Sequence, residues 1–425
     1  MRTVRTATVL AATATLVAAL VGWAAPAAAA YTDPLTTTTT QGLVWHATPA
    51  AALSALDAAL PNVSANTVVH DANYPMTGCT DTEQAALPIA PTATAAMCWD
   101  ADRAGSTAWT PQSITTSGDA DDDGRWGADK ILVSGWHGES SLGTGTDGTS
   151  RYDDARLMFV NDNDPSAAAF RMVYLAVPNS TGSTFTAAKA HVGGMAWYGD
   201  KIYVTAVGNT STAIRVFSTT HILQMSSGTA AIGAVSGGYA AYGYKYAMMQ
   251  VGYYSYAGGT CSMASDTGVP CFSSMSLDRS TSPDSVVTTE YFSDQSLRGR
   301  LYRYPMGGDY LLAADSSGRV AATEAYRSGV GNMQGVLGHG GHWYVAHSSA
   351  TLPGQLYDQT TSASIPSYCG DPSTPACWAR HPEALTYDGS TGLVWSVTEW
   401  APSACADNGQ TCGRTVFAVP LSALP

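Results

Sequence analysis

Hydrogen-bonding side chains recur at the starts of several β-rich runs in this 425-residue chain. The runs align on small residues that precede apolar strands, and their polar groups are of two kinds. They are the amide or carboxyl side chains Gln112, Gln250, Gln334 and Glu383, and the imidazoles His191 and His381. We expect these groups to converge on one ligand site, although hydrogen bonds that tie strands to exposed backbone are an equal alternative.

The carboxyl groups of this set bear on whether it could hydrolyse a glycoside. That reaction usually needs two carboxylates, one as acid and one as nucleophile or base. The aligned starts offer Glu383, and Glu399 follows one strand later in Ser-Val-Thr-Glu-Trp. A glycosidase would otherwise need a carboxylate from a loop, such as Asp200 or Asp315.

Elimination from an acidic polysaccharide demands fewer acids. It needs a base, a proton donor and neutral groups that face the uronate carboxyl. His191 would be the base, and Gln112 and Gln334 would face the carboxyl. Tyr198 or Tyr387 would donate the proton to the leaving oxygen. We therefore expect a carbohydrate-active enzyme, with a lyase preferred over a glycosidase. A non-catalytic, lectin-like or scaffold protein is the alternative.

An acidic segment resembles the first half of a calcium-binding loop. Asp119, Asp121 and Asp123 alternate and are followed by Gly, as in loops whose oxygens surround Ca²⁺. The twelfth position of such a loop carries Glu, whereas Lys130 stands here, one residue after Asp129. Ca²⁺ bound by these aspartates and a solvated acidic turn are both open.

The N-terminal 30 residues predict export. Arg2 and Arg5 precede an apolar stretch, and small residues lead up to Ala30. A positive start, a short apolar region and small residues before the cut are typical of a signal peptide, here residues 1–30. We expect a secreted, extracellular protein that begins near Tyr31.

The eight cysteines agree with an oxidising compartment. They lie as sequence neighbours, and pairing within each neighbour pair is the simplest expectation. The pairs are Cys79 with Cys98, Cys261 with Cys271, Cys369 with Cys377, and Cys405 with Cys412.

The charge and composition narrow the range of partners. A formal charge of −13 and a pI near 4.9 argue against nucleic acid and anionic membranes. After the signal peptide, no segment is apolar over the length needed to span a bilayer. We expect a monomer whose partner is an extracellular glycan or a small polar ligand.

The chain divides into two parts after the signal peptide. Residues 31–108 are rich in Ala, Thr and Pro, and Thr48–Leu60 has helical apolar spacing, with Thr48 as N-cap and Pro49 in the first turn. Residues 109–425 consist of short β-rich runs with Gly-containing turns.

The repeated runs predict an all-β fold, a β-propeller with one four-stranded blade for each repeat. Five runs favour five blades, and six are possible if residues 31–108 supply strands. A β-sandwich is the alternative, although it would not explain the repeated polar starts.

Two resemblances to known proteins support the propeller. Several runs resemble a family of secreted actinobacterial proteins of the Streptomyces type, from about Trp99 to the C-terminus. They are Trp109-Thr-Pro-Gln-Ser-Ile-Thr-Thr-Ser, Ala190-His-Val-Gly-Gly, Ser276-Leu-Asp-Arg-Ser, Ala322-Thr-Glu-Ala-Tyr-Arg and Met333-Gln-Gly. This resemblance implies a secreted, propeller-like protein in which Gln112, His191 and Gln334 are family features, and it implies no activity. The segment His381-Pro-Glu-Ala-Leu-Thr-Tyr-Asp is similar to the inner strands of gluconolactonase-like and NHL-type propellers.

Overall fold

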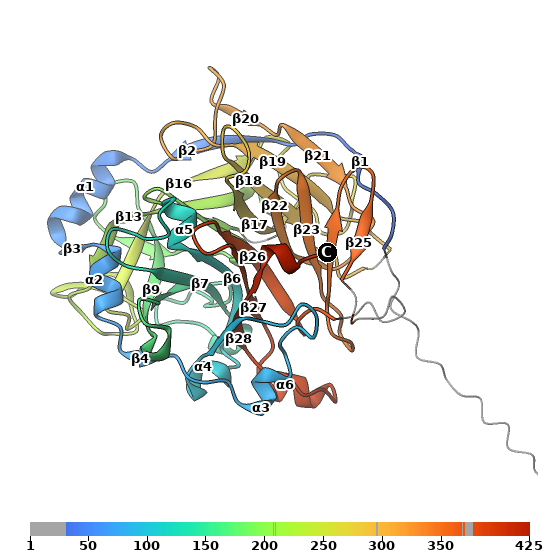
Figure 1. Cartoon of the computed structure of the whole chain (residues 1–425). Helices are drawn as coiled ribbons and strands as arrows, with labels where there is room; N and C mark the ends of the chain where they lie inside the picture. The colour runs from blue at the N-terminus through green and yellow to red at the C-terminus, as the bar shows by residue number, and fades with distance from the viewer. Residues whose placement is uncertain (1–30, 207, 209, 295, 368, 370–376) are drawn as a thin grey trace, which may run out of the picture.

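The predicted all-β class is confirmed by a computed structural model of the chain (Figure 1). It describes residues 31–206, 208, 210–294, 296–367, 369 and 377–425. The predicted signal peptide lies outside these residues. Within them, strands dominate and the helices are few and short.

Most strands form antiparallel runs of four that follow one another along the chain. The first run is β6 (Trp109–Thr116), β7 (Ile131–Gly138), β8 (Ala155–Asn161) and β9 (Ala169–Pro178). The second is β11 (Met195–Tyr198), β12 (Lys201–Thr205), β13 (Thr212–Gln224) and β16 (Tyr246–Tyr256). The third is β17 (Phe272–Asp278), β18 (Ser285–Glu290), β19 (Arg300–Pro305) and β21 (Glu324–Arg327). The fourth is β22 (Met333–His339), β23 (His342–His347), β24 (Gln355–Gln359) and β25 (Ser364–Pro366).

The last run is completed by a strand from the N-terminal part of the chain. β26 (Pro382–Asp388), β27 (Leu393–Thr398) and β28 (Thr415–Pro420) follow in sequence, and β5 (Ala95–Cys98) pairs with the outer edge of β28. A strand from the N-terminal part of the chain and three strands from its C-terminal part therefore share one sheet.

The first strands of the runs contact one another in a closed circuit. β6 contacts β11, β11 contacts β17, β17 contacts β22, β22 contacts β26, and β26 returns to β6. Figure 1 shows β6, β17, β22 and β26 near the middle of the molecule. The arrangement is propeller-like, because the first strands surround a common centre.

Alternating side chains join each run to its two neighbours. In β7, Val133 packs with Trp197 and other residues of the second run, whereas Leu132 packs with Trp395 of the last run. Successive side chains of a strand point to opposite faces of the sheet, so one apolar strand serves two interfaces. This alternation explains why the strands are buried on both faces.

The N-terminal segment wraps the outside of these sheets, as the blue ribbon of Figure 1 shows. β1 (Thr36–Thr37) pairs with β21, and β2 (Gly42–Ala47) pairs with β16 and with β20 (Arg319–Ala321). Shorter strands add to the same sheets or form a hairpin. They are β3 (Asn62–Val63), β4 (Tyr74–Pro75), β10 (Phe185–Ala187), and the β14 (Ile232–Val235) and β15 (Gly238–Ala241) pair.

The expected helix is present as α1 (Ala50–Ala59), with Pro49 rather than Thr48 at its N-cap. The Thr48 hydroxyl instead donates to the backbone carbonyl of Gln250, so it anchors the helix to β16. Further short helices were not expected from the sequence. They are α2 (Ala65–His70), α3 (Asp81–Gln84), α4 (Ala101–Ala104), α5 (Ser117–Ala120) and α6 (Pro402–Asp407).

All four predicted cysteine pairs are confirmed as disulfides. Each closes a short loop, and Cys79–Cys98 also fixes β5 to the segment before it. Four disulfides are consistent with an extracellular protein. None of the helices in the described part of the chain has the length and apolar character to cross a membrane.

Candidate functional site

A β-bulge interrupts four of the five first strands at an equivalent point. The pairing register shifts across Gln112 in β6, Ser273 in β17, Gln334 in β22, and Glu383 with Ala384 in β26. A bulge residue leaves the hydrogen-bonding ladder, so its side chain can be aimed away from the regular sheet faces. Gln112, Gln334 and Glu383, which the sequence aligned, occupy this shared position.

The backbone before the bulges adopts an unusual conformation. Val192, Asn332 and His381 have φ angles of 50°, 46° and 47°, which residues with a Cβ rarely adopt. Gly193 follows Val192, and a Cβ at Gly193 would lie 2.2 Å from the carbonyl oxygen of Ser273. Such strain persists where the surroundings fix the chain and often marks functional sites. Because Val192 and His381 share this backbone conformation, they occupy equivalent positions. His191 therefore lies one residue before the position equivalent to His381, not at it.

A cavity of about 500 Å³ lies beside the bulges. Gln112, His191, Gln334 and Glu399 all line it, so the structure brings together four of the residues singled out in the sequence. Its other polar side chains are Tyr152, Asp153, Ser273 and Tyr291, and its apolar part is formed by Ala206, Gly208, Met263, Cys271 and Phe272. The cavity thus combines hydrogen-bonding groups with aromatic faces, which suits a sugar.

Two glutamates from neighbouring strands form a carboxyl pair at this cavity. The Gln112 side-chain amide donates to Oε1 of Glu399 at 2.8 Å. Glu383 is buried behind Glu399, and neither of its oxygens accepts a hydrogen bond from a described residue. Burial, and then the charge of Glu399, raise the pKa of Glu383 well above its usual value. Glu383 is therefore held in its protonated form beside Glu399.

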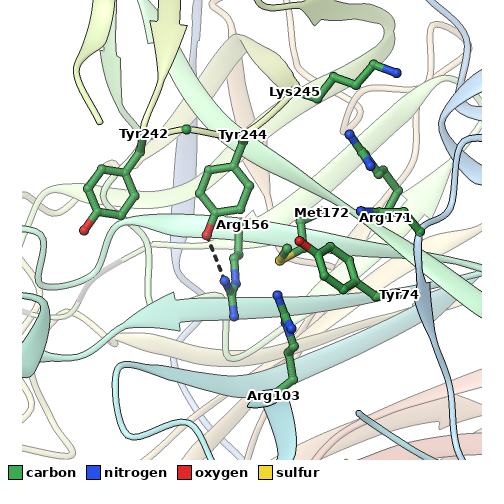
Figure 2. A pocket seen from close by; sticks show the side chains of 10 residues that line it. Tyr74, Arg103, Arg156, Arg171, Met172, Tyr242, Tyr244 and Lys245 are labelled. Carbon is green, nitrogen blue, oxygen red and sulfur yellow. Dashed lines mark hydrogen bonds between the residues drawn. The ribbon is translucent and has the colours of Figure 1, made fainter. Parts of the chain in front are cut away.

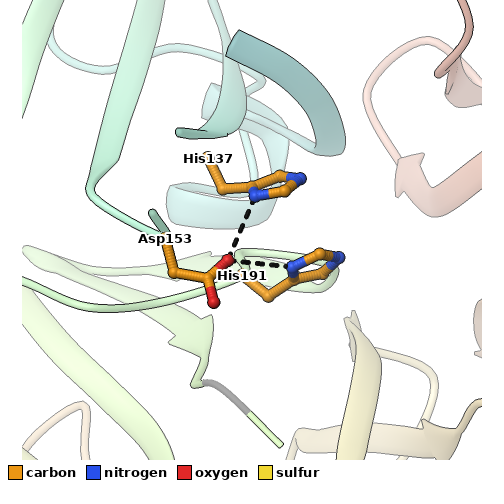
Figure 3. A group of neighbouring side chains, drawn as sticks. All are labelled: His137, Asp153 and His191. Atoms are coloured by element: carbon orange, nitrogen blue, oxygen red, sulfur yellow. Dashed lines mark hydrogen bonds and ion pairs between the residues drawn. The ribbon is translucent and has the colours of Figure 1, made fainter. Parts of the chain in front are cut away.

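His191 forms a hydrogen-bonded pair with Asp153 on the cavity wall (Figure 3). Its Nδ1 lies 3.2 Å from Oδ1 of Asp153, and its Nε2 points away from that carboxylate. Burial lowers the pKa of His191, but the hydrogen bond to Asp153 and the charges of Asp153, Glu399 and Glu139 outweigh it, so the pKa is raised. Burial also acts on Asp153, yet its two histidine partners lower its pKa to about 2.

A second imidazole completes this cluster. His137 Nδ1 lies 3.1 Å from the same Asp153 oxygen, and its ring is 4.0 Å from that of His191, centroid to centroid. Burial, then the charge of His191, lower the pKa of His137, so it is the neutral histidine of the two. Of the described residues, His137, Asp153 and His191 form the group whose ligand atoms, within 4.8 Å of one another, could hold a metal ion. The hydrogen bond from His191 to Asp153 and the ion-pair contact of His137 with the same carboxylate account for this arrangement.

Four predicted site residues do not line the cavity: the buried Glu383, described above, and three residues that lie elsewhere. Gln250 belongs to β16, the outer strand of its run, and accepts from Arg215 at 2.7 Å. His381 stacks on Trp400 at 3.7 Å, and burial lowers its pKa to about 4. Tyr198 lies at the far end of β11, where its hydroxyl donates to Asp284.

The aspartates of the expected calcium loop have separate partners. Asp119 is buried and accepts from Thr115 and Thr386, whereas Asp121 and Asp123 are exposed and accept from backbone amides. Asp129 accepts from Asn66 and Asn163 and lies 3.1 Å from His70. Their carboxylates therefore point in different directions, and Ca²⁺ at this loop stays a prediction.

Sequence reasoning missed Asp153, Tyr152, Ser273 and Tyr291. Ser273 was detectable in principle, because Phe272-Ser-Ser-Met-Ser opens β17, the first strand of the third run, which the alignment of the sequence missed. Asp153 lies outside the repeated runs, in the loop between β7 and β8, and only the fold brings it to His191.

No family model and no curated protein matches the chain. Among solved structures, it is similar to a GH43_1 enzyme from Xanthomonas citri, with 10% identity over 87% of this chain and 93% of that one, and a TM-score of 0.29. The same enzyme with xylotriose gives 9% identity over the same shares and the same TM-score. A Bacteroides uniformis protein named as a 6-phosphogluconolactonase gives 13% identity over 65% of this chain and 66% of that one, with a TM-score of 0.23. Similarities this distant do not indicate what the present chain binds.

Proposed function

We propose that this chain is a secreted, five-bladed β-propeller that hydrolyses a neutral glycan in its central cavity. The closed circuit of five first strands, with β5 completing the last run, supports five blades. The four disulfides support an extracellular setting. Phe272, Tyr152 and Tyr291 offer faces on which a sugar ring can pack.

One observation carries the reaction. The Glu399 side chain and a histidine with a raised pKa, His191, line the same cavity. A histidine that favours its protonated form can act as the general acid, and a carboxyl group in the same cavity can act as the general base. The Gln112 amide donates to Glu399, Glu383 beside it is held neutral, and Asp153 stabilises the His191 imidazolium.

Glu399 and His191 together supply the proton transfers that hydrolysis of a glycosidic bond requires. Glu399 takes a proton from water as the water oxygen bonds to the anomeric carbon. The glycosidic carbon–oxygen bond breaks as His191 gives its Nε2 proton to the leaving oxygen. The products are a new reducing end and a free hydroxyl, and exchange with solvent restores both side chains.

Hydrolysis fits the cavity better than the elimination favoured by the sequence. Elimination would require His191 to be a neutral base, whereas its surroundings favour the imidazolium. A uronate would also lie close to the charge of Glu399, and the Gln112 amide, expected to face the substrate carboxyl, is bonded to Glu399.

The experiment is a glycan panel with product analysis. We expect new reducing ends from a neutral polysaccharide and no unsaturated products. Glu399→Gln and His191→Ala should each lower the rate by about 10²–10⁴-fold, the range for positioned acid–base groups. His342→Ala, at a histidine on β23 away from the cavity, is the matched control and should retain full activity.

Two outcomes would contradict the proposal. Saturable glycan binding without any new reducing ends would favour the non-catalytic, lectin-like alternative. Unsaturated products from a uronic-acid polysaccharide would restore the lyase.

A further inference from the structure

A second cavity, of about 280 Å³, lies on the outer side of the first run of strands (Figure 2). Every charged side chain that lines it is cationic: Arg103, Arg156, Arg171 and Lys245. The other lining residues are Asn73, Tyr74, Met172, Tyr242, Gly243 and Tyr244. This concentration of positive charge is unexpected in a chain with a formal charge of −13 and only 20 Lys and Arg residues.

Arg156 is the buried member of this group. Its exposed fraction is 5%, and within the described part of the chain it has no carboxylate partner. Nη1 donates to the Tyr244 hydroxyl at 2.8 Å, whereas Nε has no hydrogen-bond partner among the described residues. A buried charge without a counter-ion costs free energy that a bound anion would offset.

The other three cations share few carboxylates, and none of those carboxylates lines the cavity. Arg171 and Lys245 both contact Asp71, at 3.4 and 2.8 Å, and Arg103 contacts Asp100 at 3.2 Å. Figure 2 shows the guanidinium groups of Arg103 and Arg156 turned toward the same space. Burial lowers the pKa of Arg156, and the charge of Arg103 lowers it further, so the two groups repel each other.

The tyrosines on the opposite wall are held by a tight turn. Tyr242 and Gly243 have φ angles of 52° and 82°, and the Tyr244 amide donates to the carbonyl of Ala241. Consecutive residues with positive φ form the turn type that favours Asn and Gly, so a tyrosine there is strained. The turn presents Tyr242 and Tyr244, whose rings stack, beside the cations.

We propose that this cavity binds the oxyanion of an acidic sugar. Guanidinium groups match sulfate, phosphate and carboxylate oxygens with paired N–H donors, which is the chemistry that these three anions share. The rings of Tyr74 and Tyr244 line the cavity, but their faces are covered by Phe170 and Arg103 and by Tyr174 and Tyr242, so the cations rather than ring stacking carry the recognition. Of the described residues, none lines both this cavity and the central one, so the second site is independent of the proposed catalysis.

The test is a titration of the purified protein with sodium sulfate, sodium phosphate and glucuronate, with glucose as the neutral control. Binding is measured by calorimetry and by the fluorescence of Trp109 and Trp136, whose rings lie 4.2 and 5.3 Å from the Arg156 guanidinium. We expect saturable binding of at least one anion, no binding of glucose, and weaker binding as NaCl is added. Preference for glucuronate would identify a uronate, and preference for sulfate or phosphate an ester.

Variants separate the cavity from the general surface charge. Arg156→Gln should weaken anion binding at least tenfold. Because Arg156 is buried, Lys245→Gln at the more exposed rim is the second variant, with an expected several-fold loss in a fully folded protein. Arg319→Gln, at an exposed arginine of β20, is the matched control and should bind like the unmodified protein. Failure of all three anions to saturate, or full binding by both cavity variants, would overturn the proposal.

Discussion

Asp119 offers a sharp test of how the acidic segment works. Its carboxylate is buried and accepts from the hydroxyls of Thr115 and Thr386, at 2.5 and 2.6 Å. Burial nevertheless raises its pKa from 3.8 to about 7. Asp119→Asn keeps the size of the side chain and an oxygen that can accept from the two hydroxyls, but it cannot ionise.

The direction in which Asp119 changes the free energy of unfolding with pH depends on how many protons the folded and the unfolded protein bind. Between pH 3.8 and about pH 7 the folded protein keeps the Asp119 proton, whereas the unfolded chain has released it. The contribution of Asp119 to stability therefore falls as pH rises through this window and is constant outside it. At 1.36 kcal/mol for each pKa unit, the whole fall is about 4 kcal/mol.

The assay is the free energy of unfolding from denaturant titrations at pH 4 and pH 8. We expect Asp119→Asn to be more stable, relative to the unmodified protein, at pH 8 than at pH 4, by about 4 kcal/mol. Comparing the two pH values cancels any effect of the substitution that does not depend on ionisation. Asp121→Asn, at an exposed aspartate of the same segment, is the matched control.

A gain of equal size at both pH values would refute the reasoning about burial. A loss of stability at pH 8 that appears only with added Ca²⁺ would instead favour the calcium loop expected from the sequence.

Three further predictions address the central cavity and the metal question. Asp153→Asn should lower the pKa of His191, so the alkaline limb of kcat/KM should move to lower pH; an unmoved limb would exclude His191 as the proton donor. Tyr198→Phe should leave activity unchanged within about twofold, because its hydroxyl is bonded to Asp284 at the far end of β11; a loss of 10²-fold or more would place it in the reaction. If the acidic segment binds Ca²⁺, a chelator should lower the melting temperature, whereas no change would end that prediction.

Repetition in the sequence predicted the strands better than the segment that surrounds them. Gln112, Gln334 and Glu383 were alignable because each sits at a bulge in a first strand, and a bulge keeps the same place when the strand repeats. The prediction that Gln250 belongs to a first strand was wrong, because it lies in β16, an apolar outer strand whose sequence resembles that of a first strand. The true counterpart, Ser273, has too small a side chain to stand out.

The parts of the site that come from loops could not be predicted. Asp153 follows no repeat, and its contact with His191 joins positions 38 residues apart that only the folded loop brings together. The one-residue shift between His191 and His381 depends on a left-handed backbone at Val192, which sequence spacing does not reveal. Asp119 likewise belongs to an acidic run in the sequence, but the turn of α5 buries it while Asp121, Asp122 and Asp123 stay exposed.

The proposed hydrolysis is tested most directly by measuring the release of reducing ends, because each cleaved glycosidic bond produces one. The unmodified protein and Glu399→Gln are incubated with the same neutral polysaccharides across the pH range. The proposal predicts reducing ends from the unmodified protein, greatest below the raised pKa of His191, and their near-complete loss in Glu399→Gln with the melting temperature unchanged. Equal release by both proteins, or none from any neutral glycan, would contradict it.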